Sequence, residues 1–588
     1  MLLERSRTKA QIRFLMTWIF ILVSGFAAAQ TLPVTSASSL NEIGSGVPTV
    51  AENFDFSQFQ NVQSSHPSNA ESENVEPDVA ENILTQPWWL QPNEVLQPGV
   101  QSLELEHLIW QAIEHSPYVR SLLIEPQIQE ARANQTLGAF DPTPFLNSML
   151  HDTSNPVGNT LTTGGPVHLN ENLVENSAGI KAKTQSGALT ELTQEMNFKD
   201  NNSIFFLPHN QADGKMVMRY TQPLMRGAGV TYNRSSFVIA SLSTVENTQI
   251  VTKKIQEHVF AVTSNYWELY VAHAYYLQSE RGLKRLIQLR DQLAGRGDLD
   301  SLRSQLLRAD SQISKQRMQQ TRASAQFTIA AAKLRAAVAA PELVDSSSGF
   351  MPITLPADWR SNISVGAELN LALNFHPDIQ ATQARVKAAR VKLQVAENEL
   401  RPTLNLVMEG YLRGLNGDNN FGSSFGDQFS QGAPSYSLGA TYQRPYRNRA
   451  AKAIYQEKRL EMQKVLFDLD NTLRTVGSDV EGAVALAQSA FVELESAVRS
   501  TLASSQELQY LNGRWRNAYL DGSQSGTSLL LDQLLNAEIQ LIAAENAWAR
   551  SQADHMLALA RVRLASGSLL PVVDAAKEQL INLPESAR

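Results

Sequence analysis

The longest regular pattern of hydrophobic positions runs from Thr231 to Ala294, a stretch with no proline and a single glycine, Gly282. An average spacing of 3.5 residues between apolar positions is typical of the seam of a left-handed coiled coil. A helix of this length would be roughly 95 Å long, more than a compact globular core can hold. The pattern therefore predicts a long helix that needs partner helices. The seam positions are Ile255, Val259, Val262, Tyr266, Leu269, His273 and Tyr276.

The same succession of elements occurs twice along the chain. Residues 105–117 and residues 365–377 share a helical pattern that ends in a proline, and the same offset relates Pro142 to Pro402. Two prolines in one register with similar patterns between them indicate an ancient duplication.

Each half is expected to contain two shorter helices, two strands and two longer helices. The second helix of each half has roughly 22 residues and the last roughly 40, so stacked end to end they can pair antiparallel with the long helix. This predicts helical rods with strands at one end. The strands are expected at 144–152, 216–222, 403–412 and 436–443, the long helices at 231–294 and 446–512, and the last helices at 299–340 and 528–566.

Apolar and polar residues alternate in the predicted strands, which gives each strand one apolar and one polar face. In a soluble sheet the apolar face packs on a core. In a membrane barrel it faces lipid, and the polar face lines the lumen. Few other segments of the chain could cover the apolar face, which favours the barrel. The apolar positions are Met216, Met218 and Tyr220, then Leu404, Leu406 and Met408, then Tyr436, Leu438, Ala440 and Tyr442.

Four strands cannot close a barrel, because about eight are needed, and open strand edges are not tolerated in lipid. The chain is therefore expected to oligomerise. The first strand region is longer than the second, and Ser177–Lys183 and Thr190–Phe198 flank the pair Ser186-Gly187. This arrangement predicts an additional hairpin, which would extend the outer loops or add strands.

Residues 1–29 are predicted to be a secretory signal peptide. Basic residues precede an apolar run from Phe14 to Phe26, and three alanines at 27–29 offer a small-residue cleavage site. The alternative is an N-terminal membrane anchor. No later stretch reaches the ~20 apolar residues of a membrane-spanning helix, so a membrane location would have to depend on strands.

Residues 30–100 are predicted to be a low-complexity leader, because they are rich in Ser, Asn, Glu and Pro and have few apolar residues beyond Trp88-Trp89-Leu90. This tryptophan cluster either docks on the body of the protein or has no partner. The first repeat is placed at 101–341, the second at 342–570 and a C-terminal tail at 571–588.

Composition excludes several function classes. The formal net charge of −8 and the lack of a basic tail argue against nucleic acid as a partner. With no cysteine, disulfides and thiolate chemistry are excluded. The histidines form no metal motif, and no phosphate-binding loop or nucleophile elbow occurs. Gly227-Ala228-Gly229 is interpreted as a corner between strand and helix, and His273 as a packed seam residue. We predict no enzyme activity, no cofactor and no metal site.

Several short segments, in their order and spacing, resemble the TolC-type outer membrane efflux proteins. The resemblance covers about residues 100–570. It implies a mostly α fold with a membrane β-barrel, made of two tandem repeats of long antiparallel coiled-coil helices plus barrel strands, four per chain, and closed by trimerisation. The segments are Thr221–Gly229, Tyr266–Leu269, the Ser116-Pro117 and His376-Pro377 turns, Leu306–Ala309 and Leu534–Ala537.

The resemblance also implies a function. A homotrimer in the cell outer membrane, surrounded by outer-membrane lipid, would extend a helical tunnel into the periplasm. It would act as the exit duct of a tripartite efflux or type I secretion system for small molecules or polypeptides. Its partners would be a periplasmic adaptor protein and an inner-membrane pump, either proton-driven or of the ABC type.

In such proteins acidic residues at the periplasmic helix tips form the gate. This sequence offers Asp298 and Asp300 at one helical turn and Asp521 and Asp532 at the other. The family's acidic positions themselves fall on Gln533 and Asn536, so the four aspartates could equally be ordinary solvated helix-cap acids.

Two other classes compete with the channel. A periplasmic adaptor also uses a long helical hairpin, but it should have one hairpin flanked by two halves of a lipoyl-like domain, and this sequence predicts two hairpins. A purely structural exported coiled-coil rod would leave the alternating strands and their flanking prolines unexplained.

Overall fold

The computed structural model describes residues 87–90, 101–161, 163–295, 300–344, 350–357, 362–417, 420–521 and 527–570. All of them belong to the second of the two units into which the chain divides, Glu76–Arg588. The predicted signal peptide 1–29, most of the leader 30–100 and the tail 571–588 lie outside the described residues.

Prolines set the start of two corresponding helices, because proline at the first helical turn loses no hydrogen bond and its φ suits a helix. Pro117 begins α5 and Pro377 begins α11, as the sequence predicts. Each follows a short helix from which it is separated by one residue. The four helices are α4 (Leu105–His115), α5 (Pro117–Leu137), α10 (Val365–Phe375) and α11 (Pro377–Glu399).

The long helices form two antiparallel hairpins. Two predicted boundaries are wrong. A separate turn of helix, α6 (Val230–Asn233), comes before the first long helix, and the second long helix continues through Gly513 to residue 521. A Cβ atom at Gly513 would meet no other atom, and one glycine costs a helix only about 1 kcal/mol. The helices are α7 (Ser235–Ala294), α8 (Asp300–Val338), α13 (Arg449–Asp521) and α14 (Thr527–Ala565).

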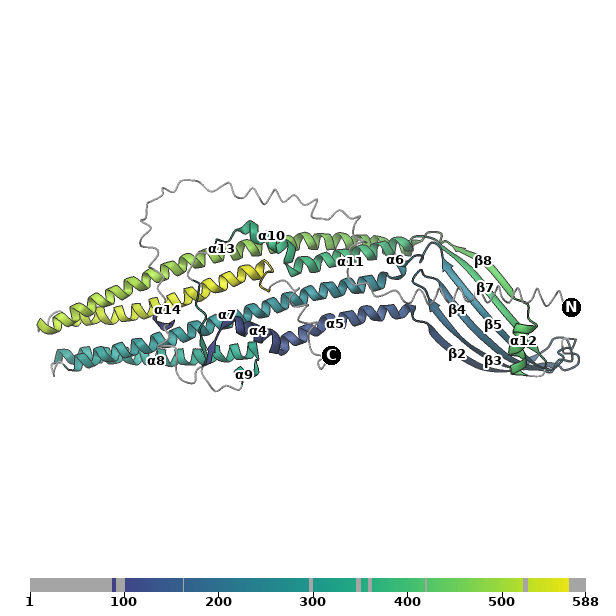
Figure 1. Ribbon diagram of the computed structural model, residues 1–588, viewed down its shortest axis with the longest axis horizontal. Helices are drawn as coiled ribbons and strands as arrows, with labels where there is room; N and C mark the ends of the chain where they lie inside the picture. Colours follow the sequence, from purple (N-terminus) through teal and green to yellow (C-terminus); the bar gives the residue numbers. More distant parts are fainter. Residues whose placement is uncertain are drawn as a thin grey trace. The chain divides into compact units, whose positions relative to one another are not determined.

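The helices form a strip with two unlike edges. The central helix α7 contacts α5 and α8 on one side and α11 and α14 on the other, and α13 packs beyond α11 and α14 (Figure 1). The edges of the strip are therefore α5 with α8 at one side and α13 at the other. None of the helices in the described ranges is long and apolar enough to cross a membrane.

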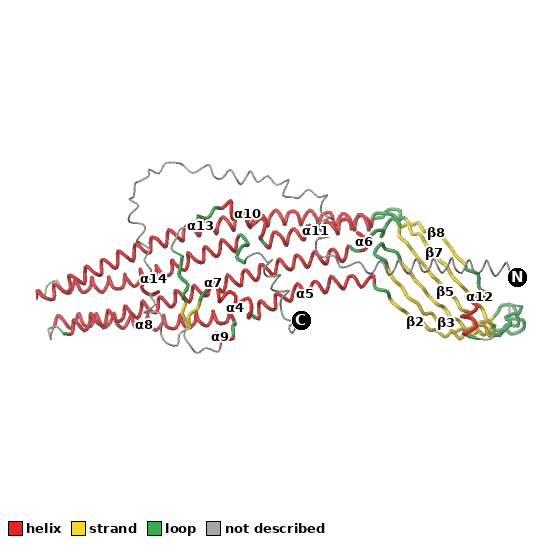
Figure 2. Tube along the Cα trace, viewed as in Figure 1, coloured by secondary structure: helices red, strands yellow, loops and turns green. Residues whose placement is uncertain are grey.

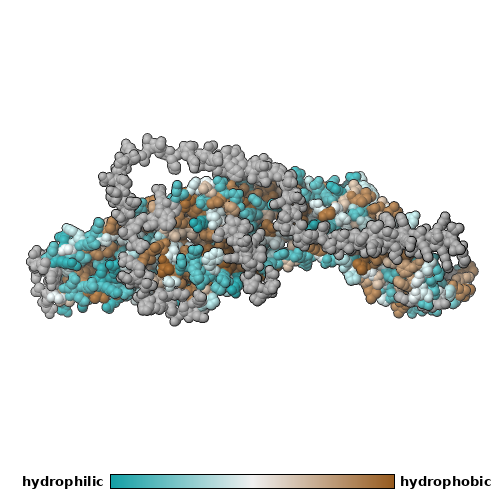
Figure 3. Space-filling view, viewed as in Figure 1, coloured by the Kyte–Doolittle hydropathy of each residue, from teal (hydrophilic) through white to brown (hydrophobic). Residues whose placement is uncertain are grey.

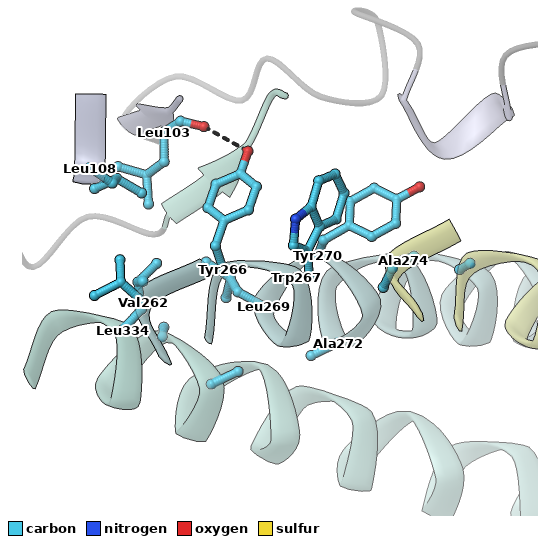
Figure 4. Packing of buried hydrophobic residues seen from close by; sticks show 14 of the residues in the cluster. Leu103, Leu108, Val262, Tyr266, Trp267, Leu269, Tyr270, Ala272, Ala274 and Leu334 are labelled. Atoms are coloured by element: carbon cyan, nitrogen blue, oxygen red, sulfur yellow. Dashed lines mark hydrogen bonds between the residues drawn. The ribbon is translucent and has the colours of Figure 1, made fainter. Parts of the chain in front are cut away.

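The largest buried side chains gather in the middle of α7. Tyr266, Trp267 and Tyr270 are fully buried, and Trp267 makes edge-to-face ring contacts with both tyrosines (Figure 4). The Tyr266 hydroxyl donates to the carbonyl of Leu103 at 3.1 Å and accepts from the Thr354 amide at 3.0 Å. It thus joins α7 to a small parallel pair of strands, β1 (Gln101–Leu103) and β6 (Phe350–Pro352).

The tryptophan cluster of the leader docks on this core. Residues Trp88–Leu90 form the 3-10 helix η5, and Trp89 is buried. Its indole nitrogen donates to the Tyr270 hydroxyl at 3.2 Å, and its ring lies 5.1 Å from that of Trp548 on α14. Of the two alternatives that the sequence left open for this cluster, docking is observed. The short helix α9 (Pro341–Val344) completes this region.

The sheet has six strands in the order β2-β3-β4-β5-β7-β8, all antiparallel. The expectation of four strands per chain is therefore wrong, because the predicted additional hairpin becomes the full-length strands β3 and β4, which are labelled in Figure 1; Figure 2 draws the strands in yellow. The strands are β2 (Thr143–Pro156), β3 (His168–Lys183), β4 (Leu189–Asn201), β5 (Asn210–Pro223), β7 (Thr403–Asn416) and β8 (Ser435–Gln443).

Two short elements complete the sheet region. The 3-10 helix η6 (Gly138–Phe140) connects α5 to β2. A ten-residue helix, α12 (Phe421–Ser430), connects β7 to β8 and packs against β5 and β7. The sequence predicts neither element.

Candidate channel-forming surfaces

The register of the strands separates the sheet into two chemically different faces. Gln194 of β4 pairs with Ala178 of β3 and with Met216 of β5, which in turn pairs with Leu412 of β7. Because side chains alternate along each strand, all even-numbered residues of the six strands share one face and all odd-numbered residues share the other. The predicted alternation of Met216 and Met218 with Lys215 and Arg219 is confirmed.

The odd-numbered face carries ion pairs from strand to strand. Lys199 lies 2.7 Å from Glu171, and Arg219 lies 3.1 Å from Glu409. Opposite charges on neighbouring strands stabilise a sheet by roughly 0.2–1 kcal/mol a pair, and here they give this face pairs of charges between the strands from β3 to β7. The remaining pairs are Lys181 with Glu191, Lys215 with Glu195, and Arg413 with Asp213. The His151 ring lies 3.5 Å from Glu175, a contact that is an ion pair only when the histidine is protonated.

The even-numbered face is mostly apolar, and it is well exposed on the edge strands β2 and β8. Leu146 and Leu150 project from β2, and Leu438 and Tyr442 from β8, all well exposed. Figure 3 shows apolar surface over the strands. A large exposed apolar area of this kind marks an interaction surface or a membrane contact.

Both edge strands have one side without a partner among the described residues. β2 follows α5 and leads away from the helices, and β8 leads back towards α13. β2 and β8 therefore run in opposite directions. The free edge of β8 in one copy could pair antiparallel with the free edge of β2 in another. Free edges of this length invite such pairing.

The corner between β5 and the first long helix is held by polar contacts. Gly227 and Gly229 have φ values of 81° and 97°, a conformation that favours glycine. The amide of Gly227 donates to Asn398 at 2.8 Å, and both Arg226 and Tyr232 contact the carboxylate of Glu399. The interpretation of this glycine pair as a corner is thereby confirmed.

The four predicted gate residues are only partly described. Asp298 lies outside the described residues. Asp300 begins α8 and Asp521 ends α13, which puts both at hairpin ends. Asp532 on α14 pairs with Arg308 on α8 at 2.6 Å, so its carboxylate bridges the two hairpins. The gate assignment itself remains a prediction. No local pattern could have revealed this partner, because the two residues are far apart in sequence.

A second ion pair, whose carboxylate is buried, also joins the hairpins. Arg285 on α7 donates to Glu538 on α14 at 2.8 Å. About two helical turns beyond Glu538 on α14, the carboxylate of Glu545 accepts a hydrogen bond from the indole nitrogen of Trp88 at 3.0 Å. Burial is the main cause that raises the pKa values of Glu538 and Glu545, while nearby arginines act in the opposite direction. These contacts were not predicted from the sequence.

His273 is packed as predicted. Its ring lies 5.5 Å from that of Phe327 on α8. Burial lowers the pKa of His273 to about 4, so the ring is neutral at neutral pH. A neutral, packed histidine contributes to the contact between α7 and α8 and is not placed to carry charge.

Comparisons with known proteins show a likeness of fold to solved outer-membrane channels. No model of a known protein family matches the chain, and no curated protein matches its sequence. Solved structures do match. The outer-membrane channel OprN is 16% identical with a TM-score of 0.56, over 79% of this chain and 90% of that chain. The Campylobacter jejuni CmeC outer membrane channel is 13% identical with a TM-score of 0.56, over 82% of this chain and 90% of that one.

The outer membrane protein VceC from Vibrio cholerae is 15% identical with a TM-score of 0.54, over 79% of this chain and 97% of that one. At these identities the likeness concerns the fold. The chain has the fold of the outer-membrane channel proteins, as the resemblance to the TolC-type family implies. OprN and CmeC are outer-membrane channels, and the absence of enzyme activity in this chain stays a prediction from its sequence.

Proposed function

We propose that the chain is the outer-membrane exit duct of a tripartite efflux or type I secretion system. The observation that supports this most directly is the sheet, which has one apolar face, one ion-paired face and two free antiparallel edges. If copies join at these edges, the apolar face meets lipid and the charged face lines a water-filled lumen. That is the arrangement of outer-membrane barrels.

In this proposal three copies close the barrel. Three copies of a six-stranded sheet make eighteen strands, where the resemblance implied twelve. Barrel diameter grows roughly linearly with strand number, and barrels of about 16–18 strands leave an aqueous channel. The lumen would then be about half as wide again as that of a twelve-stranded barrel.

The helical strip would close in the same ring. The edge made of α5 and α8 lies on the side of β2, and the α13 edge lies on the side of β8. Exposed apolar side chains on the two edges, such as Leu460 and Phe467 on α13 and Ile124 on α5, would lie in the contact between copies. The tunnel would extend through the periplasm, and the hairpin ends with the four aspartates would contact a periplasmic adaptor and an inner-membrane pump.

The test is the mass of the full-length protein extracted in detergent from the outer-membrane fraction, with the bound detergent subtracted. We expect three times the mass of one chain. A soluble periplasmic monomer would contradict the proposal and favour the adaptor or the structural rod. The single-residue pair Leu438→Cys and Ser437→Cys, described below, tests the membrane location independently.

A further inference from the structure

The helix α12 has its polar and apolar faces reversed relative to a helix on a water-exposed surface. Two of its polar residues face the sheet. Gln428 is 0% exposed and Ser424 is also buried. Its aromatic residues Phe425 and Phe429 point away and are each 44% exposed, with ring centroids 5.6 Å apart. A surface helix in water shows the opposite order.

The sheet supplies hydrogen-bond partners for the buried polar residues of α12. The side-chain amides of Gln428 and Gln194 exchange two hydrogen bonds, of 3.1 and 3.3 Å. The Ser424 hydroxyl donates to the carbonyl of Gly414 at 3.4 Å. Because buried amides without partners are costly, this pairing fixes which face of α12 points inward.

Two glycines allow the helix to approach the sheet this closely. Gly214 of β5 and Gly414 of β7 are register partners. A Cβ atom at Gly414 would lie 2.3 Å from the amide nitrogen of Gln428, and one at Gly214 would lie 3.0 Å from the carbonyl oxygen of Ser424. The position of α12 against the sheet is therefore built into three separate segments of the chain.

An apolar groove lies beside the helix on the same face of the sheet. Leu146, Ala178, Met196 and Phe425 line it, together with Asn176 and Gln194. The groove continues into the exposed apolar positions of β2, including Leu150. It belongs to the even-numbered face, the one that the proposed function turns towards lipid.

We propose that the outer face of α12 and this groove bind the hydrocarbon chains of outer-membrane lipids. The inference rests on the proposed function. A second copy is the less suitable occupant of the outer face of α12, because copies would join at the edge strands β2 and β8, whereas α12 packs on the inner strands β5 and β7. The helix lies in the connection at the strand ends remote from the long helices, which corresponds to the outer leaflet.

The sequence makes a direct test possible, because the chain contains no cysteine. Single variants Phe425→Cys and Phe429→Cys carry one nitroxide spin label each, in the full-length protein reconstituted into phosphatidylethanolamine–phosphatidylglycerol vesicles. Collision rates with oxygen, which concentrates in hydrocarbon, are compared with those of a water-soluble nickel chelate. The neighbours Leu438→Cys and Ser437→Cys on opposite faces of β8 are the matched controls.

We expect the oxygen-to-nickel ratio at positions 425 and 429 to exceed the ratio at 437, as the ratio at 438 does. A low ratio at 425 and 429 with a high ratio at 438 overturns the lipid site and leaves the proposed function intact. Low ratios at 437 and 438 alike contradict the proposed function itself. Labels at 425 and 429 that neither reagent reaches would mean that protein covers α12, which also overturns the inference.

Discussion

The two long helices, α7 and α13, hold corresponding places in the two halves of the chain, yet they bury very different surfaces. α7 lies between two layers and buries Tyr266, Trp267 and Tyr270 completely. α13 lies at the edge of the strip, and its Phe467 is 75% exposed. The two helices thus differ in burial because of their positions in the strip. The surface of α7 finds its partners within the chain, whereas the outer surface of α13 has no partner among the described residues.

The largest effect should come from the core of α7. Trp267→Ala should lower the free energy of unfolding by about 3–5 kcal/mol, the usual cost of truncating a buried tryptophan. Denaturant unfolding of the detergent-solubilised protein, followed by circular dichroism, measures it. The control is Trp110→Ala, at an exposed position on α4, which should change stability little. Equal effects of the two variants would contradict the packing described.

The two ion pairs that join the hairpins should differ in strength. Glu538→Ala leaves Arg285 partly buried without its partner, so it should cost about 3 kcal/mol, the low end for a broken buried pair. Asp532→Ala removes an exposed pair and should cost less than about 1 kcal/mol. The same unfolding assay compares them. A larger loss for Asp532→Ala would show that the hairpin ends, rather than their middle, hold the two hairpins together.

His273 should make stability depend on pH. Its pKa in the folded protein is lowered to about 4, below the unfolded value of about 6.5. The folded state therefore binds fewer protons, and stability is lost as the pH falls from about 6.5 to 4, by at most about 3 kcal/mol. His273→Gln should flatten this part of the profile. The raised pKa values of Glu538 and Glu545 act in the opposite sense, because the folded state binds more protons at these two groups. This contribution should remain in the variant. An unchanged pH profile of the variant would mean that a group other than His273 causes the loss of stability in acid.

The smallest effect on unfolding is expected at Phe467 of α13. Phe467→Ser replaces an exposed side chain, so within one chain it should change stability by less than about 0.5 kcal/mol. If copies meet at this edge, the variant should dissociate at a higher protein concentration than the parent, as measured by light scattering in detergent. Unchanged assembly would remove α13 from the interface and weaken the contrast with α7.

The sequence predicted the helices better than it predicted their ends. Prolines such as Pro117 and Pro377 begin helices for local reasons, so both starts were correct. The break at Arg234 leaves no mark in the periodicity. Gly513 indicates a turn by its residue type, yet it costs a helix only about 1 kcal/mol, so the helix continues through it. The pairing of Asp532 with Arg308 likewise depends on two hairpins meeting, and no local signal marks it.

The sheet shows the same limit. Alternation found the apolar face and the additional hairpin, but β3 starts as early as His168 because its ladder with β2 continues through residues without alternation. The segment Phe421–Ser430 contains two glycines and three serines and resembles a loop. It becomes helical where Asn420 caps its start and the glycines of β5 and β7 leave room for it.

The unlike edges of the strip also bear on the number of copies. An edge of α5, α8 and β2 that meets an edge of α13 and β8 is a heterologous contact, and such a contact places no limit on its own repetition. The angle between neighbouring copies alone decides whether a ring closes or a helical filament grows. The same angle must close both the ring of strands and the ring of helices. Each sheet has two strands more than the four predicted, and an insertion that widens the layer of strands changes the symmetry that the layer of helices must have.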